Sequence, residues 1–281
     1  MPDKIHTSVD LSGEDIHWKP EGGLSYGRYL GLDQVLSAQS PITDEHDELM
    51  FIVIHQAGEL WLKLCLHELD GAIACIRSGN TGPAFKMIAR IARIQEQLTQ
   101  SWSILATMTP ADYLRFRDKL GQSSGFQSAQ YRMLEYKMGN KNADLARVHE
   151  DTPVYDEVLA ALNEPSIYDE ALKLLAHAGF DIPASATDRD WSRPYEASQA
   201  VEDAWKTVYQ NTDKYWALYE LAEKLVDLEY RFQTWRFSHM KTVERIIGFR
   251  RGTGGSSGVG YLVKALDLRF FPELWTVRTS L

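Results

Sequence analysis

The stretch DELMFIVIHQAGELWLKLCLHELDGAIACIR, residues 47–77, decides the fold class of this chain. Its apolar residues recur every three or four positions, which is the period of an α-helix, so it predicts one long helix. One apolar stripe, which we expect to face the core, consists of Val53, Ala57, Leu60 and Leu64. A second stripe on the same helix consists of Phe51, His55, Gly58 and Leu62.

The same period continues along the chain. A turn at 78–83 separates the first helix from a second one at 84–108, whose apolar face contains Ile88, Ile91, Leu98, Trp102 and Leu105. Thr109-Pro110-Ala111-Asp112 predicts a restart, with Thr as cap, Pro at the first helical position and Asp at the third. Further helices are predicted at 124–139, 166–179 and 199–249, the last with a break near Asn211, and 181–193 reads as a loop. Because strand signals are weak, we predict an all-α, single-domain protein of long packed helices over residues 1–281.

Composition bounds the class of protein. The 281 residues are 44% hydrophobic and 25% charged, which is typical of a soluble globular chain. A formal net charge of −9 argues against nucleic acid as a partner and gives no sign of binding to an anionic membrane. Cys65 and Cys75 fall on different faces of one helix and suit a reducing cytoplasm. The first ten residues lack the apolar run of a signal peptide and no run reaches the roughly 20 residues of a membrane span, so we expect a cytoplasmic protein.

A glycine-rich loop, residues 250–260, follows the last long helix and contains the run RGTGGSSGVG. A phosphate-binding Walker loop is disfavoured because no Lys follows the glycines, and a dinucleotide fingerprint because no strand precedes them. A mobile loop that settles over a ligand and an exposed flexible loop both fit the composition. In the first case its N–H groups and the Thr253 hydroxyl can hydrogen-bond an anionic group.

Two of the eight histidines have unusual neighbours. His55 lies in FIVIHQAGELW and His239 in FQTWRFSHMKTVERIIGF, both within apolar helical runs. Neither belongs to a zinc pattern, and no C-x-x-C-H motif for covalent haem attachment is present. Each is compatible with a packed core histidine or with a site in which one axial imidazole holds a single haem among apolar side chains.

Arg117 is a candidate anion-binding residue. Tyr113 and Arg117 are four positions apart and share one helix face. A guanidinium can hold a carboxylate through two parallel hydrogen bonds. The alternative is a surface arginine paired with Asp112 or Asp118.

Together these segments resemble the haem-dependent tryptophan 2,3-dioxygenase family, and the resemblance covers nearly the whole chain. The segments that carry it are LSYGRYLGLDQVLSAQ (24–39), HDELMFIVIHQAGELWLK (46–63), YLRFRDKLGQSSGFQSAQYR (113–132), FQTWRFSHMKTVERIIGFRRGTGGSSGVGYL (232–262) and FFPELWTVRTS (270–280). Their order and their combination are specific to that family.

The resemblance implies a haem enzyme that adds O2 across the indole C2–C3 bond of L-tryptophan. The product would be N-formyl-L-kynurenine, in the first step of tryptophan degradation by the kynurenine pathway. The family implies one non-covalent haem b per subunit, with Fe2+ in the active form. It also implies a homotetramer built as a dimer of dimers, in which an N-terminal arm, residues 1–45, is exchanged between subunits.

The resemblance also implies roles for individual residues. His239 matches the axial ligand of the haem iron, and His55 matches the distal histidine that faces the indole N–H. Arg117 matches the partner of the substrate carboxylate, and Thr253 a hydrogen-bonding partner of the ammonium and carboxylate end. The other matched substrate-binding positions are Phe51 and Tyr113, and Tyr26, Tyr29 and Leu30 reaching in from the neighbouring subunit.

Two adjacent positions depart from the family pattern. This chain has Ala57-Gly58 after His55-Gln56, where several bacterial relatives have Thr-Ser. Loss of these hydroxyls near the distal histidine would change water order or affinity and leave the reaction in place. Two other classes stay compatible with the residues alone: a haem-based O2 sensor or carrier, and a helical interaction protein whose aromatic residues only fill the core.

Overall fold

The computed structural model describes residues 8–18 and 23–281 of the chain, which divides into two compact units, Met1–Ser40 and Pro41–Leu281. The described residues form thirteen α-helices and three short 3-10 helices, with no β-strand among them. The prediction of an all-α fold is therefore confirmed. Of the arm predicted at 1–45, residues 1–7 and 19–22 lie outside the described residues.

The first unit contains two short helices, α1 (Tyr26–Leu30) and α2 (Leu32–Val35). The Ser25 hydroxyl caps α1 by accepting from the backbone N–H of Arg28. Gly31 ends α1 at a φ of 61°, a left-handed conformation that glycine adopts without strain. Residues 26–35 are therefore two short helices joined at Gly31.

The second unit is built on a long helical hairpin, α3 (His46–Arg77) and α4 (Thr81–Leu105). Gly79, at a φ of 76°, makes the tight turn between the two helices. Helix α4 begins three residues before the predicted Ala84, because Pro83 lies in its first turn, where a missing N–H costs nothing. A Cβ at Gly71 would lie 2.9 Å from Met87 Sδ, so this glycine lets α3 and α4 approach closely.

The prediction for the core face of α3 is only partly correct: Leu64 packs against the main core, but two other residues of the stripe are exposed. Val53 and Leu60 of the expected core stripe are 45% and 55% exposed. The buried side chains of α3 instead include Ile54, Leu62, Cys65, Leu66, Leu69, Ala72, Ile73 and Ile76. Both stripes are apolar, so helical period alone does not say which one the neighbouring helices cover.

Helix α3 also corrects the expectation about membrane spans. By length and composition it is long and apolar enough to cross a bilayer. In the fold, however, α3 packs against α4, α6 (Ala129–Met138) and α8 (Ile167–His177), and it contributes the fully buried Cys65 and Leu69 to the main core. Only 17% of the most apolar 18-residue stretch of α3 is buried, so the packing of this helix within the chain is partial.

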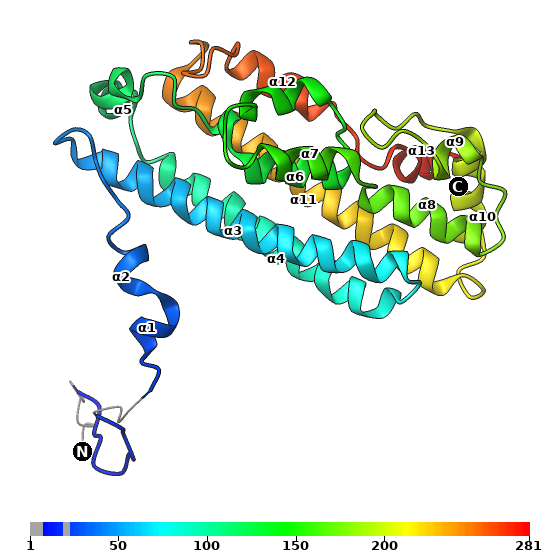
Figure 1. Cartoon of the computed structure of the whole chain (residues 1–281), viewed down its shortest axis with the longest axis horizontal. Coiled ribbons are helices and arrows are strands. Elements are labelled where there is room, and N and C mark those ends of the chain that lie inside the picture. The colour runs from blue at the N-terminus through cyan, green and yellow to red at the C-terminus, as the bar shows by residue number, and fades with distance from the viewer. Residues whose placement is uncertain (1–7, 19–22) are drawn as a thin grey trace, which may run out of the picture. The chain divides into compact units, whose positions relative to one another are not determined.

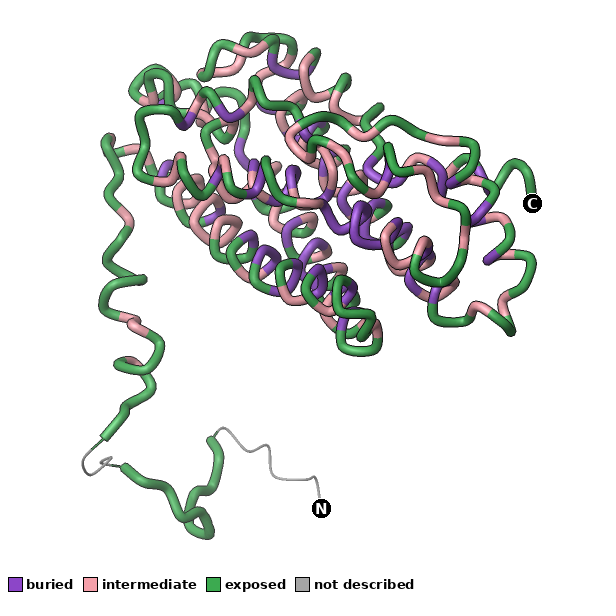
Figure 2. The backbone as a smooth tube through the Cα atoms, turned by 45° about the vertical axis from the view of Figure 1, so that its right-hand side comes forward, coloured by how far each residue is buried: buried purple, intermediate pink, exposed green. Residues whose placement is uncertain are grey.

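Helix α11 (Trp216–Ile247) lies beside α4 and runs in the same direction. Arg231 forms an ion pair with Glu96 at 2.9 Å, and Arg245 Nε donates to the carbonyl of Ala106 at 2.9 Å. Figure 1 shows α3, α4 and α11 as the long helices of this unit, and Figure 2 shows buried backbone running along them. A separate α10 (Gln199–Gln210) precedes α11, so the predicted break near Asn211 is confirmed.

Shorter helices cover the long ones. Thr109, Pro110 and Asp112 form the predicted start of α5 (Pro110–Arg117), with a complete capping box. The loop predicted at 181–193 contains one helical turn, α9 (Ala184–Thr187). The remaining elements are η1 (Asp118–Leu120), η2 (Gly125–Gln127), η3 (Ala143–His149), α7 (Tyr155–Asn163), α12 (Val259–Leu266) and α13 (Pro272–Ser280).

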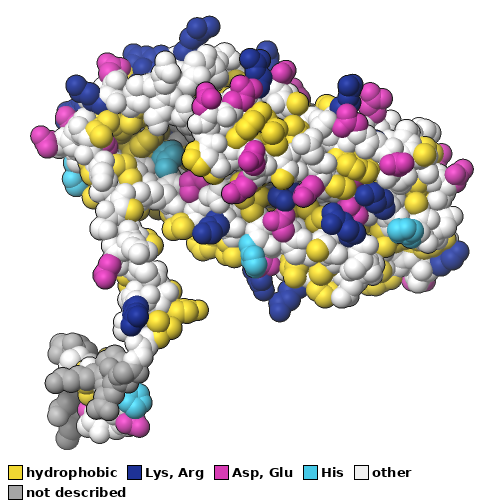
Figure 3. Space-filling view, viewed as in Figure 1, with side chains coloured by type: hydrophobic (Ala, Val, Ile, Leu, Met, Phe, Trp, Pro, Cys, Tyr) yellow, Lys and Arg dark blue, Asp and Glu magenta, His cyan; other side chains and the backbone are white. Residues whose placement is uncertain are grey.

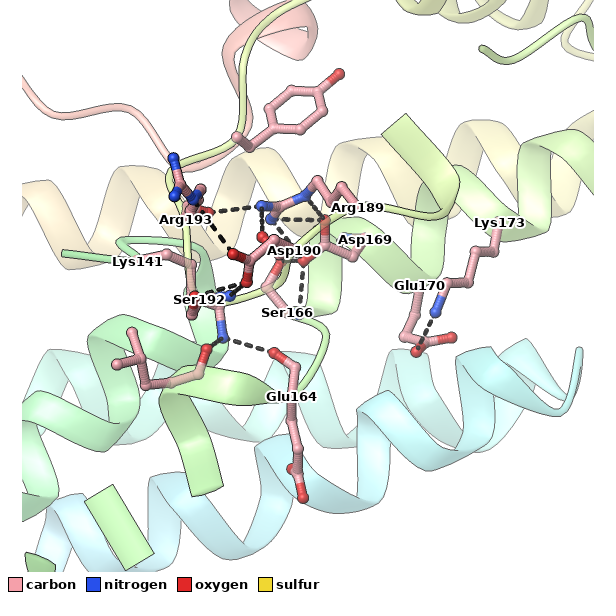
Figure 4. Close-up of polar contacts among 12 residues, drawn as sticks. Lys141, Glu164, Ser166, Asp169, Glu170, Lys173, Arg189, Asp190, Ser192 and Arg193 are labelled. Carbon is pink, nitrogen blue, oxygen red and sulfur yellow. Dashed lines mark hydrogen bonds and ion pairs between the residues drawn. The ribbon is translucent and has the colours of Figure 1, made fainter. Parts of the chain in front are cut away.

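Buried polar groups join these covering helices (Figure 4). Lys141, which is 1% exposed, donates from Nζ to the carbonyls of Ala161, Leu162 and Glu164 at 2.8, 3.1 and 2.6 Å. Two of these carbonyls lie in the last turn of α7 and the third follows it, so the Lys141 amino group satisfies acceptors that the helix leaves free. Burial lowers the pKa of this amine to about 7. Arg189 holds the α8 capping residue Asp169 through Nε and Nη2 at 2.9 and 3.1 Å.

The C-terminal segment returns to the body through Glu229 of α11. Its buried carboxylate accepts from the backbone N–H groups of Phe270 and Phe271 and from Trp275 Nε1, at 3.0, 3.1 and 2.8 Å. Phe270 and Phe271 are 3% and 0% exposed. This C-terminal segment therefore belongs to the core. The glycine loop is accordingly held at both ends, by α11 before it and by this segment after it.

Candidate active site

A cavity of about 770 Å³ lies within the second unit, in the range typical of ligand and cofactor sites. Its walls come from α3, α4, α5, α6, α11 and the glycine loop, and they are mostly apolar. Figure 3 shows a hollow in the surface near α5, with hydrophobic side chains and a histidine visible inside it. Six of the residues predicted for the site line this single cavity: Phe51, His55, Tyr113, Arg117, His239 and Thr253.

His239 reaches the cavity from α11, and its ring stacks on Trp102 of α4 at a centroid distance of 4.6 Å. Burial, with a smaller contribution from His55, lowers the pKa of His239 to about 4. The imidazole is therefore neutral at physiological pH, which is the form that binds a metal.

The residues around His239 fit a haem. Trp102 and Trp235 flank the imidazole, and their buried indole N–H groups have no hydrogen-bond partner in the protein. Buried donors are normally paired, so both are available to a bound group. In the described part of the chain no cluster of His, Cys, Asp or Glu could hold a bare metal ion, whereas a haem needs only one axial imidazole in an apolar pocket.

His55 lies on α3, where Phe51 fixes its orientation. His55 Nδ1 is 2.7 Å from the carbonyl oxygen of Phe51, and the two rings are 4.2 Å apart. A carbonyl can only accept, so Nδ1 carries the proton and Nε2 of the neutral ring is left as an acceptor. Burial lowers the pKa of His55, which keeps this neutral form dominant.

Arg117, the last residue of α5, lines the cavity and contacts both the glycine loop and Asp118. Its Nη2 donates to the carbonyl oxygen of Arg251 in the glycine loop at 2.8 Å, while the carboxylate of Asp118 is 3.9 Å away. Tyr113, one turn earlier, packs against Phe51 at 5.9 Å, and burial raises the pKa of its phenol. Arg117 therefore joins the cavity wall to the loop.

The glycine loop is folded against the segment that follows α5. Thr253 Oγ1 donates to the carbonyl of Ser123 at 2.5 Å, and Gly252 N–H donates to the carbonyl of Ser256 at 3.2 Å. Gly258 has a φ of 63°, and an added Cβ there would lie 2.5 Å from the carbonyl oxygen of Arg250. The loop ends slightly earlier than predicted, because α12 begins at Val259.

Comparison with known proteins identifies the family. The model of the tryptophan 2,3-dioxygenase family matches residues 12–281. The tryptophan 2,3-dioxygenase of Geobacillus thermodenitrificans is 54% identical over 267 residues, covering 95% of each chain. That of Ralstonia pickettii is 56% identical over 259 residues, 92% of this chain and 93% of its own.

The chain belongs to the tryptophan 2,3-dioxygenase family. Gly58, one of the two positions where we expect a departure from the family pattern, lies at the site itself, because it lines the cavity one turn from His55. An added Cβ at Gly58 would meet only Leu98 Cδ2, at 4.0 Å, so this dioxygenase family member has open space there.

Three residues expected to reach the site from a neighbour lie in the first unit. Tyr26, Tyr29 and Leu30 belong to α1 and are 76%, 72% and 42% exposed. Their contact with the pocket of a neighbouring dioxygenase subunit stays a prediction.

The sequence analysis of this dioxygenase family member missed several residues that line or border the cavity. Trp235 precedes His239 by four positions, a spacing that places both on one helix face and was a usable signal. Trp102 comes from another helix, and no local pattern connects it to His239. The pair Glu59 and Gln130 likewise joins α3 to α6 only in the folded chain.

Proposed function

We propose that this chain cleaves the indole C2–C3 bond of L-tryptophan with O2 and releases N-formyl-L-kynurenine. Both oxygen atoms of O2 enter the product, so no external electron donor is needed. Membership of the tryptophan 2,3-dioxygenase family supports this reaction. The observation that carries it in the structure is that one cavity combines the neutral imidazole of His239, the acceptor nitrogen of His55 and the guanidinium of Arg117.

We assign one haem b per subunit to the cavity, where His239 would bind its iron, with Fe2+ as the active state. Trp102 and Trp235 are the donors available to it, and the aromatic wall supplies its apolar surroundings. When bound, the haem supplies the iron chemistry that activates O2. The protein residues supply binding, orientation and exclusion of water.

His55 and Arg117 divide the recognition of the substrate between them. His55 Nε2 accepts the indole N–H, because Nδ1 is already committed to Phe51. Arg117 holds the carboxylate, and charge-assisted bonds of this kind are strongest where water is excluded. Phe51 and Tyr113 supply apolar surface for the indole ring.

The glycine loop closes over the amino-acid end of the substrate. Thr253 provides the hydroxyl that hydrogen-bonds the ammonium and carboxylate groups, and exchanges its bond with Ser123 for these partners. The bond from Arg117 to the Arg251 carbonyl links the residue that holds the carboxylate to the loop that covers it. Closure excludes water while the ring is opened.

The assembly we assign is a cytoplasmic homotetramer, a dimer of dimers, in which Tyr26, Tyr29 and Leu30 enter the pocket of a neighbour. Their exposed aromatic and aliphatic surfaces support a role in contact with another chain. The exposed apolar stripe on α3 that contains Val53 and Leu60 is a second surface of the kind that subunit interfaces cover.

The test is to mix the reduced, haem-loaded protein with L-tryptophan in air and follow N-formylkynurenine by its near-ultraviolet absorbance. With 18O2 the product should gain both labelled atoms. His239→Ala should lose bound haem and its Soret absorbance. A coloured wild-type protein that leaves L-tryptophan unchanged would contradict the proposed reaction, and an unchanged Soret band in His239→Ala would contradict the ligand.

A further inference from the structure

The turn of α3 after His55 places a carboxylate beside the distal histidine. Glu59 follows His55 by four positions, so the two side chains are neighbours on one helix face. Both residues line the cavity. The sequence drew attention to His55 alone, and the proposed reaction so far gives Glu59 no role.

Gln130, from α6, fixes the orientation of Glu59. Its Nε2 donates both to the Glu59 carboxylate oxygen Oε2 and to the Glu59 backbone carbonyl, each at 2.8 Å. One amide thus bridges the side chain and the main chain of the same residue, which removes the rotamer freedom of a glutamate. The partner is also neutral, so the negative charge is not cancelled by a cation at that oxygen.

The other ionisable side chains of the cavity leave this charge significant. They are Glu48 on α3, Tyr113 and Arg117 on α5, Tyr131 on α6, His239 and Arg236 on α11, and Tyr261 on α12. Arg236 is compensated by its buried ion pair with Glu135. Glu48 is two turns from His55 and already accepts three hydrogen bonds from Ile42 and Thr43.

The electrostatic effect on His55 has a definite sign. Burial lowers the pKa of His55, and the hydrogen bond to Phe51 and the charge of Glu59 both raise it. An anion one helical turn away stabilises positive charge on the imidazole. The carboxylate thus opposes the desolvation that would otherwise make His55 a weaker base.

We infer that Glu59, oriented by Gln130, is a positioning residue for the distal histidine, and that its charge strengthens His55 Nε2 as acceptor of the indole N–H. The inference rests on the proposed function, because it assumes that the indole N–H meets His55. Glu59 acts through His55 and does not touch the substrate. As the indole N–H bond polarises, the partial positive charge that develops on His55 is balanced by Glu59.

The experiment compares wild type with Glu59→Gln, which keeps the shape and removes the charge. The ferrous haem-loaded protein is bound to CO, and the C–O stretching frequency is recorded against pH. This frequency responds to positive charge beside the ligand, so its midpoint reports protonation of His55, and His55→Ala should abolish the transition. In Glu59→Gln we expect the midpoint to fall by about 0.5–1 pH, and kcat to fall several-fold with KM little changed.

Three controls separate the charge from the fold. Glu59→Asp keeps the charge and should restore most of the wild-type midpoint, although its shorter side chain loses Gln130. Gln130→Leu should move the midpoint part of the way down, because the released carboxylate is better solvated. Asp70→Asn removes a charge from the same helix about 22 Å from His55 and should leave the midpoint unchanged.

The outcomes distinguish this inference from the proposed function. An unchanged midpoint in Glu59→Gln, or an equal shift in Asp70→Asn, would overturn the role of Glu59 even in an active enzyme. If wild type forms no N-formylkynurenine but the midpoint still falls in Glu59→Gln alone, the proposed reaction fails while the coupling of Glu59 to His55 stands.

Discussion

Substitution of Gly258 by Ala tests the geometry of the glycine loop. Gly258 adopts φ 63° and ψ −123°, a region that only glycine enters at low cost. An L residue held there costs about 1–3 kcal/mol. In addition, its Cβ would lie 2.5 Å from the carbonyl oxygen of Arg250, which is backbone and cannot rotate away. The alanine therefore opposes the loop geometry in two independent ways.

The size of the effect follows from these two contributions. Taking about 2 kcal/mol for the backbone conformation and at least about 1 kcal/mol for the displaced carbonyl gives about 3 kcal/mol against the closed loop. Since 1.4 kcal/mol is tenfold in an equilibrium constant, affinity for L-tryptophan should fall about 100-fold. Gly255→Ala is the matched control: its φ of 85° carries backbone strain, but an added Cβ meets nothing within 4 Å. We expect it to weaken binding only about fivefold, from about 1 kcal/mol.

The assay is a titration of the haem-loaded proteins with L-tryptophan, followed by the change in visible absorbance, together with KM. Circular dichroism should match wild type, because the loop lies outside the helical core. If Gly258→Ala binds L-tryptophan as tightly as wild type, or no more weakly than Gly255→Ala, the loop geometry described above is not the one that covers the substrate.

Three further substitutions test other parts of the structure. Arg117→Ala should weaken binding of L-tryptophan by about 1.5–3 kcal/mol, which raises KM roughly 10–150-fold. KM for tryptamine, which lacks the carboxylate, should change far less. An equal effect on both substrates would mean that another residue holds the carboxylate. Lys141→Met removes the donor of three buried carbonyls. Because the cost of burying the amine offsets part of these bonds, the free energy of unfolding in urea should fall by about 1–3 kcal/mol, and no loss would mean that water replaces the amino group. Burial raises the pKa of Glu48, but the hydrogen bonds from Ile42 and Thr43 outweigh burial and lower the pKa overall. The ionised carboxylate therefore stabilises the folded protein above about pH 4.5, and this contribution is lost as the pH falls through the lowered pKa. Acid unfolding of Glu48→Gln should accordingly depend less on pH than that of wild type over this range, and identical curves would show that Glu48 does not anchor residues 42–43.

Much of the secondary structure was predictable because its causes are local. The capping box at Thr109 and Asp112, the first-position Pro110 and the uninterrupted period over 47–77 each determine their element without help from distant residues. Helix α7 and the single turn α9 escaped prediction, since short helices have few periodic positions and depend on packing.

Some site residues could be identified from the sequence, and others could not. His55 and His239 stood out as polar rings in apolar helical runs, and Trp235 was within reach of the same argument through its spacing from His239. Trp102 was not, because it meets His239 across two helices that no sequence period relates.

By itself, the sequence determined an all-helical chain, its caps and the candidate chemistry of its histidines and Arg117, because these depend on neighbours within a turn or two. Only the tertiary structure decided which apolar stripe of α3 is buried, since both satisfy the same period and the choice belongs to α4 and α8. It also decided that Arg117 meets the Arg251 carbonyl, 134 positions away, and that Gln130 orients Glu59 across 71 positions. Contacts of that range arise from how whole helices pack, and no local pattern encodes them.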